Sequence, residues 1–243
     1  MLMKSCFFPH FFLLPLSALL FLSPAGAVSS DSEIPYPPGW DVDKPLSLTT
    51  DASYEESNFK MVNGKGMDGS PALVTTNHSS DSLLFSPGKK DLSGFDGQPT
   101  GLNISFSYRF EELPSQTDDE ENMGTVALIQ FGYDGSDKSA AAVFAIRSNG
   151  QLLFYNGNKA ITVSSVSVED TDTWTTVTAS LNYAEQTFTF SLNGKSYATA
   201  GGTSVFGFRG ESTSPNFRIK NQASPHHKSI AFDRMRVSSQ PIP

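Results

Sequence analysis

Apolar and polar side chains alternate with a period of two residues in several parts of the chain. Between positions 102 and 110 every even residue is aliphatic or aromatic, and every odd residue is polar or charged. Residues 187–192 alternate in the same way, and so does the run at 177–181 that follows Trp174. Because successive side chains of a β-strand point to opposite faces, this period indicates strands that bury one face. No segment shows the period of an amphipathic helix, so we predict an all-β chain.

Asn-Gly pairs separate the predicted strands. They occur at Asn149-Gly150, between two apolar runs, and again at Asn156-Gly157 and Asn193-Gly194. A type I′ hairpin turn needs positive φ at two successive positions, which asparagine and glycine tolerate well. The pattern therefore predicts tight antiparallel hairpins in a sandwich or barrel of about a dozen short strands.

The last apolar strand changes its pattern in the middle. Ile230 and Phe232 have one parity, whereas Met235 and Val237 have the other. A shift of one residue turns every following side chain to the opposite face, so one interpretation is a β-bulge near Asp233 and Arg234. The alternative is a strand that is buried on both faces.

Three segments in a fixed order carry a resemblance to a known family. They are Asp172-Thr173-Trp174, the strand and Asn-Gly turn at 187–195, and the apolar strand at 230–237 with its single Asp. In this order the chain resembles the concanavalin A-like lectin/glucanase superfamily, which includes laminin G-like domains. The resemblance implies a two-sheet antiparallel jelly-roll sandwich over residues 46–238, with any ligand on the concave face or the rim loops. It also implies that Trp174 is buried in the core.

The first 27 residues have the organisation of a secretory signal peptide. Lys4 precedes an apolar run at 11–22, and Ala25-Gly26-Ala27 matches a small-residue cleavage site. The apolar run is shorter than the roughly 20 residues that a membrane-spanning helix needs. We therefore expect a secreted protein, extracellular or periplasmic, with no membrane insertion.

Composition narrows the classes of partner. The chain has 17 basic and 25 acidic residues and a formal charge of −8, which argues against nucleic acid as a partner because nucleic acid binds basic surfaces. Its one cysteine, Cys6, lies in the predicted signal peptide, so the mature chain has no thiol and no disulfide. We expect a monomer with one β domain, preceded by a proline-rich extended lead-in at 28–45 and followed by a short tail at 239–243.

The sequence lacks the common signatures of catalysis. Residues 64–69 match the dinucleotide fingerprint G-x-G-x-x-G, but a predicted strand follows instead of a helix, so we interpret them as a tight turn. There is no G-x-S-x-G, no H-E-x-x-H, and no E-x-D-x-E strand motif of the kind found in glycosidases of the superfamily. Carboxylates can converge from distant strands, so an enzyme stays an alternative whose catalytic residues are unknown.

One structural calcium ion is a further expectation, because many relatives with this fold bind one. Calcium prefers six to eight oxygen ligands, mostly carboxylates and backbone carbonyls. Asp233 interrupts an apolar strand and matches the recurrent Asp of the superfamily, and Asp134 and Asp137 lie three residues apart in one loop. The alternative for each is a solvated charge or a turn-capping side chain.

Sugar recognition relies on aromatic faces that pack against pyranose rings, beside planar polar side chains. The candidates that combine these features are Tyr133, Tyr155, Arg109, Phe208 and Arg209. We therefore predict a secreted, non-catalytic carbohydrate-binding or cell-envelope module whose partner is a polysaccharide or glycan. The two alternatives are an enzyme, either a polysaccharide lyase or a glycosidase acting on an extracellular glycan, and a structural or adhesion protein.

Overall fold

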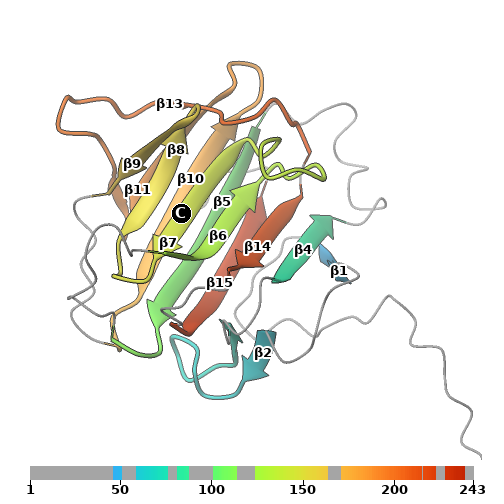
Figure 1. Ribbon diagram of the computed structural model, residues 1–243, viewed down its shortest axis with the longest axis vertical. Helices are drawn as coiled ribbons and strands as arrows, with labels where there is room; N and C mark the ends of the chain where they lie inside the picture. The colour runs from blue at the N-terminus through green and yellow to red at the C-terminus, as the bar shows by residue number, and fades with distance from the viewer. Residues whose placement is uncertain are drawn as a thin grey trace, which may run out of the picture.

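The computed structural model describes residues 46–50, 59–75, 81–87, 101–113, 124–163, 171–214, 216–222 and 228–238. These residues form two antiparallel sheets that pack face to face (Figure 1), which confirms the predicted all-β sandwich. No described segment is helical, and none therefore supplies a long apolar helix that could cross a membrane. The predicted signal peptide, the lead-in at 28–45 and the tail at 239–243 lie outside the described residues.

The first sheet, called sheet A here, contains seven strands. Their order across the sheet is β1-β4-β14-β6-β7-β8-β9. The bounds are β1 Leu46–Thr50, β4 Asp81–Pro87, β14 Phe217–Asn221, β6 Thr125–Phe131, β7 Ala142–Arg147, β8 Leu152–Asn156 and β9 Lys159–Thr162. Strand β14 lies between β4 and β6 although it is distant from both in sequence, so the sheet joins the two halves of the chain.

The second sheet, called sheet B here, has the order β12-β11-β10-β5-β15-β3-β2, and β13 pairs with β11 beside this path. The bounds are β12 Lys195–Ser196, β11 Thr187–Leu192, β10 Thr175–Asn182, β5 Gly101–Phe110, β15 Ile230–Ser238, β3 Ala72–Thr75, β2 Phe59–Val62 and β13 Phe206–Gly207. The long strand β5 lies between β10 and β15, in the middle of the sheet (Figure 1).

The core lies between the two sheets and is rich in phenylalanine. The even residues of β5 from Leu102 to Phe110 are at most 3% exposed, as their alternation predicts. Phe154 of sheet A contacts rings from the facing sheet, with ring centroids 5.0 Å from Phe190 and 4.5 Å from Phe206. Edge-to-face contacts of this kind add to the free energy gained by burying large rings. The two sheets are therefore held together by interleaved aromatic side chains.

The three Asn-Gly hairpins all form, but only one has the predicted turn. Asn193 and Gly194 both have positive φ, 48° and 77°, as a type I′ turn requires. At the other two pairs only the glycine, Gly150 or Gly157, has positive φ, so the prediction of type I′ is wrong there. The β7–β8 loop has three residues and is closed by a hydrogen bond from Arg147 N to the carbonyl of residue 151. A three-residue hairpin loop needs positive φ only at its last position, which is Gly150 here. In the β8–β9 hairpin Gly157 is the first of two loop residues, which suits a type II′ turn.

The change of pattern in the last strand is a β-bulge. The register of β15 against β5 shifts between Asp233 and Arg236, and Arg234 has a φ of 48°. Phe232 and Met235 consequently both reach the core, with exposures of 0% and 1%. The bulge is thus confirmed. The alternative also holds for the first part of the strand, because Ala231 and Asp233 on its other face are at most 1% exposed.

Candidate functional site

Polar side chains gather on the outer face of sheet A, the face turned away from the other sheet. Ile129 of β6 and Ile219 of β14 are part of the core. Alternation therefore places Gln130, Arg218 and Lys220 on the outer face, where Arg218 and Gln130 are register partners. Gln130 is fully buried and Arg218 is only 8% exposed. Polar groups this deeply buried are costly unless they are hydrogen-bonded, so another part of the chain must cover and satisfy them.

The β6–β7 loop, residues 132–141, provides this cover. It begins at Gly132, whose φ is 71° and where a Cβ atom would lie only 3.0 Å from the Ala141 Cβ. A hydrogen bond of 2.7 Å from Ala141 N to Phe131 O closes the base of the loop. Ala140 is buried against Val143 and other apolar side chains of the outer face. The loop therefore folds back over the sheet.

The segment that follows β13, residues 208–214, holds the loop in place. Arg209 N and Gly210 N donate to the carbonyls of Ala141 and Ala140, each at 2.9 Å. A Cβ atom on Gly210 would lie 2.4 Å from backbone atoms of the loop. Only glycine permits this close approach, so two chain segments far apart in sequence form one layer over sheet A.

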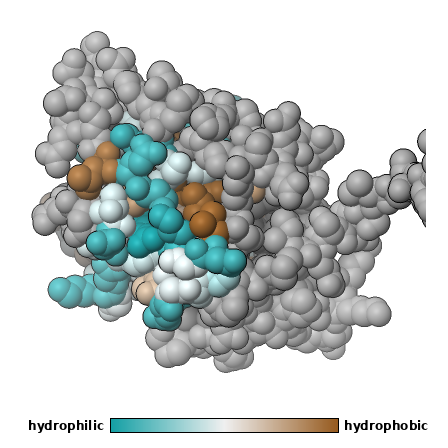
Figure 2. All heavy atoms as spheres, turned by 90° about the horizontal axis from the view of Figure 1, so that it is seen from below, coloured by the Kyte–Doolittle hydropathy of each residue, from teal (hydrophilic) through white to brown (hydrophobic). Residues whose placement is uncertain are grey.

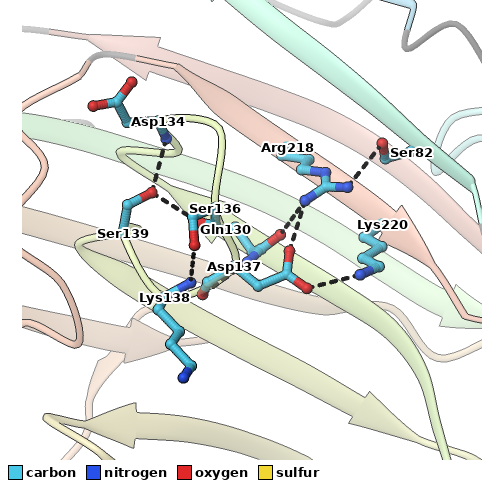
Figure 3. A network of polar contacts seen from close by, with 9 residues as sticks. All are labelled: Ser82, Gln130, Asp134, Ser136, Asp137, Lys138, Ser139, Arg218 and Lys220. Carbon is cyan, nitrogen blue, oxygen red and sulfur yellow. Dashed lines mark hydrogen bonds and ion pairs between the residues drawn. The ribbon is translucent and has the colours of Figure 1, made fainter.

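Asp137 of the loop joins two cations of β14 (Figure 3). Its Oδ1 accepts a bond from Arg218 Nη1 and its Oδ2 from Lys220 Nζ, both at 2.7 Å. Arg218 also donates to Gln130 Oε1 at 3.4 Å and to Ser82 Oγ at 3.1 Å. Gln130 Nε2 in turn donates to the main-chain oxygen of Asp137 at 3.4 Å. These five residues, called the Asp137 cluster below, satisfy the buried guanidinium and tie the loop to the sheet.

The charges in the Asp137 cluster do not cancel. Burial by itself raises the pKa of Asp137, but the hydrogen bond and charge of Lys220, the charge of Arg218 and the hydrogen bond of Gln130 outweigh it. The pKa of Asp137 therefore lies below its usual range, and the carboxylate is ionised at neutral pH. One carboxylate between two cations leaves a formal charge of +1 in a chain whose total is −8.

Two tyrosines accompany these charges, each stacked on an arginine. Arg218 Cζ lies 4.3 Å from the ring centroid of Tyr133, and Arg209 Cζ lies 4.1 Å from that of Tyr155. Both tyrosines are half-buried. A cation–π contact orients both of its partners, so each pair presents a fixed aromatic edge beside a planar group of hydrogen-bond donors.

Both pairs belong to the same face of the molecule. Arg218, Gln130 and Val143 lie at one level on the successive strands β14, β6 and β7, and Tyr155 lies on the next strand, β8. Strands in a sheet are about 4.8 Å apart, so the strands of Arg218 and Tyr155 are separated by roughly 14 Å. This separation exceeds the width of one sugar ring. The arrangement suits a ligand with several rings.

The structure places Arg109 elsewhere, on the outer face of sheet B. Its Cζ lies 4.9 Å from the ring centroid of Trp174, and its Nε donates to Glu111 at 3.2 Å. Trp174 is only half-buried, so the prediction that it lies in the core is wrong. The reason is parity: the odd residues of β10, such as Val177, face the core, which turns Trp174 outward.

Phe208 is not part of the outer-face group either. Its ring packs against Tyr183, with centroids 5.8 Å apart, and it is partly buried against the core. Of the five residues that the sequence suggests for a ligand, the structure thus brings together Tyr133, Tyr155 and Arg209.

The three candidate calcium ligands have different surroundings. Asp233 Oδ2 accepts a bond from Met67 N at 2.8 Å, and its Oδ1 accepts one from Arg234 N at 2.7 Å. Asp137 is bound to its two cations, whereas Asp134 is exposed. Within the described ranges, no three His, Cys, Asp or Glu side chains form a metal-binding group. A calcium ion at these positions stays a prediction.

The sequence reasoning missed Gln130, Arg218 and Lys220. A signal was present, because Phe217-Arg218-Ile219-Lys220 alternates in the same way as β5 and predicts two cations on one exposed face. The partner of those cations was less visible, since it comes from a loop more than 80 positions earlier.

Large apolar side chains are scarce on the described surface. Leu113 and Val205 are the large hydrophobic residues that are exposed there. Figure 2 shows one face of the molecule, on which hydrophilic residues run between two separate hydrophobic areas. The described part of this face thus presents mainly polar groups.

No protein-family model and no curated protein matches the chain. Among solved structures it is similar to a Trypanosoma rangeli sialidase, with a TM-score of 0.53 at 12% identity, over 82% of this chain and 28% of the sialidase. A second structure of that sialidase, in complex with 2,3-difluoro-KDN, gives 0.52 at 13% identity with the same coverage. The receptor-binding domain of botulinum neurotoxin type G gives 0.49 at 10% identity, over 82% of this chain and 44% of that one.

These likenesses concern the fold. The chain spans less than a third of the length of the sialidase, and the identities are too low to carry an activity across. The two sialidase structures show a β-sandwich that also occurs within a larger protein, whereas membership of the concanavalin A-like superfamily stays a prediction.

Proposed function

We propose that this chain is a secreted, non-catalytic carbohydrate-binding module whose glycan lies on the outer face of sheet A. The observation that carries the proposal is the pair of arginine-stacked tyrosines, Tyr133 with Arg218 and Tyr155 with Arg209, on one face. Sugar rings present C–H groups that pack on aromatic rings and hydroxyl groups that bond planar polar side chains. Because both arginines are already oriented by their stacks, little side-chain entropy is lost on binding.

The position of the site also supports the proposal. The β6–β7 loop and the segment 208–214 rest on a rigid sheet, and backbone hydrogen bonds hold them to each other. Binding residues are often carried by loops that a rigid scaffold positions. Asp137 of the loop and Lys220 of β14 lie on the same face and supply an acceptor and a donor for hydroxyl groups.

We expect Tyr155→Ala to weaken glycan binding about 10-fold, because central aromatic contacts contribute roughly 1–2 kcal/mol each. The measurement is affinity electrophoresis or calorimetry of the mature protein with a panel of neutral and uronate-containing polysaccharides. Trp174→Ala is the matched control, since Trp174 forms the same kind of stack with Arg109 on sheet B, and it should bind as the wild type does.

Three results would contradict this proposal in different ways. If Trp174→Ala loses binding and Tyr155→Ala does not, the site lies on sheet B. Shortened polymer would identify an enzyme and end the non-catalytic assignment. An absence of binding across the whole panel, with and without calcium, would favour the structural or adhesion alternative.

Secretion rests on the first 27 residues. We expect the exported protein to begin at Val28, because Ala25-Gly26-Ala27 is the predicted cleavage site. Expression of the full chain in a host with a secretory pathway, followed by N-terminal sequencing of the exported product, tests this. Retention of Met1 on a cell-associated product would contradict it.

A further inference from the structure

The Asp137 cluster holds more positive charge than its own carboxylate neutralises. Arg218 and Lys220 both pair with Asp137, and no other ion pair involves either cation among the described residues. A third cation of the same layer, Arg209, lies on Tyr155. The two covering segments add three exposed charges, which are Lys138, Asp134 and Glu211. Counted over the Asp137 cluster and these segments, four cations face three carboxylates, so this face keeps a formal charge of +1 although the chain as a whole is acidic.

The comparable cluster on sheet B has a second carboxylate near its cations. There Arg109 and Lys65 both pair with Glu111, and Arg109 Nη1 also lies 4.0 Å from an Asp172 oxygen. Two cations thus face two carboxylates. The two arginine–aromatic sites thus differ in the number of carboxylates beside their cations.

Lys220 is the cation best placed to meet a ligand. The Arg218 side chain is 10% exposed and its guanidinium already serves Asp137, Gln130 and Ser82. The Lys220 side chain is 22% exposed. An ammonium group has three donors, and the bond to Asp137 uses one of them. Lys220 can therefore bind an anion while Arg218 fixes the geometry beneath it.

We propose that the ligand is an acidic glycan, whose carboxylate or sulfate group binds Lys220 on the face that carries the two stacked tyrosines. This inference rests on the proposed function, because it concerns the same face. A neutral glycan would gain only hydroxyl contacts there, whereas an anionic group also compensates the unbalanced charge. Hydrogen bonds between charged partners are about twice as strong as neutral ones, so the charge should decide which glycans bind.

The test compares polymers that differ only in charge. Polygalacturonate is paired with its fully methyl-esterified form, alginate with its ester, and dextran sulfate with dextran. The wild-type protein should bind the charged polymer of a pair at least about 10-fold more tightly than the uncharged polymer. Lys220→Gln should lower the affinity for the charged polymer by about the same factor and leave the affinity for the uncharged polymer unchanged. Lys220→Arg should retain most of the affinity. The polymer pair that shows this difference in affinity tells whether the site binds a carboxylate or a sulfate group.

Lys195→Gln is the control for general attraction between a polyanion and surface lysines, because Lys195 is exposed on β12 of the other sheet. It should bind every polymer as the wild type does. Equal affinity for charged and uncharged partners, or an unchanged Lys220→Gln, would overturn the acidic-glycan inference and leave the proposed function standing. If neither these polymers nor the neutral panel bind, the proposed function and this inference fail together.

Discussion

Replacing Asp137 by alanine should lower the free energy of unfolding by about 2 kcal/mol. The substitution leaves the Arg218 guanidinium, with a side chain only 10% exposed, without a counter-charge from the loop. Gln130 and Ser82 remain as neutral acceptors and Tyr133 as a stacking partner. Because the Asp137 side chain is itself 40% exposed, the expected cost is smaller than for a fully buried ion pair. Chemical denaturation at neutral pH measures the change.

Asp134→Ala is the matched control, because Asp134 lies in the same loop but is exposed. It should stay within about 0.5 kcal/mol of the wild type. A loss of similar size in both variants would indicate general sensitivity of the loop. A loss below about 1 kcal/mol for Asp137→Ala would mean that the Arg218 pair does not hold the loop to the sheet in solution.

The pH dependence of Asp137→Asn provides a second measurement of the same interaction. The folded-state pKa of Asp137 lies below its usual range, so the ion pair stabilises the fold fully above the unfolded-state pKa of about 3.9. This contribution is lost as the pH falls through the folded-state pKa. The stability difference between the wild type and Asp137→Asn should therefore be constant near neutral pH and shrink below about pH 4.

The faces of the strands could be predicted from the sequence because burial enforces a simple rule there. Leu102 and Phe110 had to face the core since a one-residue slip would expose every large side chain of β5. The bulge near Asp233 was visible for the same reason, as it is the local change that lets Phe232 and Met235 both point inward. The prediction that Trp174 lies in the core was wrong because it followed the family resemblance and not the alternation of faces along the strand.

The candidate site was less predictable because its layer is built by loops. Nothing in the local sequence around Asp137 shows that it meets Arg218 and Lys220, since the contact depends on β14 inserting beside β6. Tyr133, Tyr155 and Arg209 could be selected by residue type, but only the stacking of sheet A and the docking of residues 208–214 bring them to one face. Alternation describes single strands, whereas this site depends on the strand order.

The close approach at Gly210 leads to the second large effect: Gly210→Ala should destabilise the protein by about 3 kcal/mol, the upper part of the range for overpacking. The added Cβ would lie 2.4 Å from the Lys138 oxygen and from two backbone atoms of Ser139. Backbone atoms cannot rotate away as a side chain can, so the segment 208–214 must separate from the β6–β7 loop. Arg209 would then leave Tyr155, and glycan binding should fall together with stability.

Gly201→Ala distinguishes this mechanism from a general effect of substituting glycine. The nearest atom to a Cβ at Gly201 is Thr199 Oγ1 at 3.9 Å, an ordinary contact, so stability and binding should both match the wild type. Denaturation and polysaccharide binding are measured on the two variants side by side. If Gly210→Ala keeps wild-type stability, the two segments are not in contact in solution. Gly210→Ala could also be destabilised and still bind glycan normally at a temperature where the variant is folded. In that case the segment that positions Arg209 has moved without loss of binding, so the Arg209–Tyr155 pair does not belong to the glycan site.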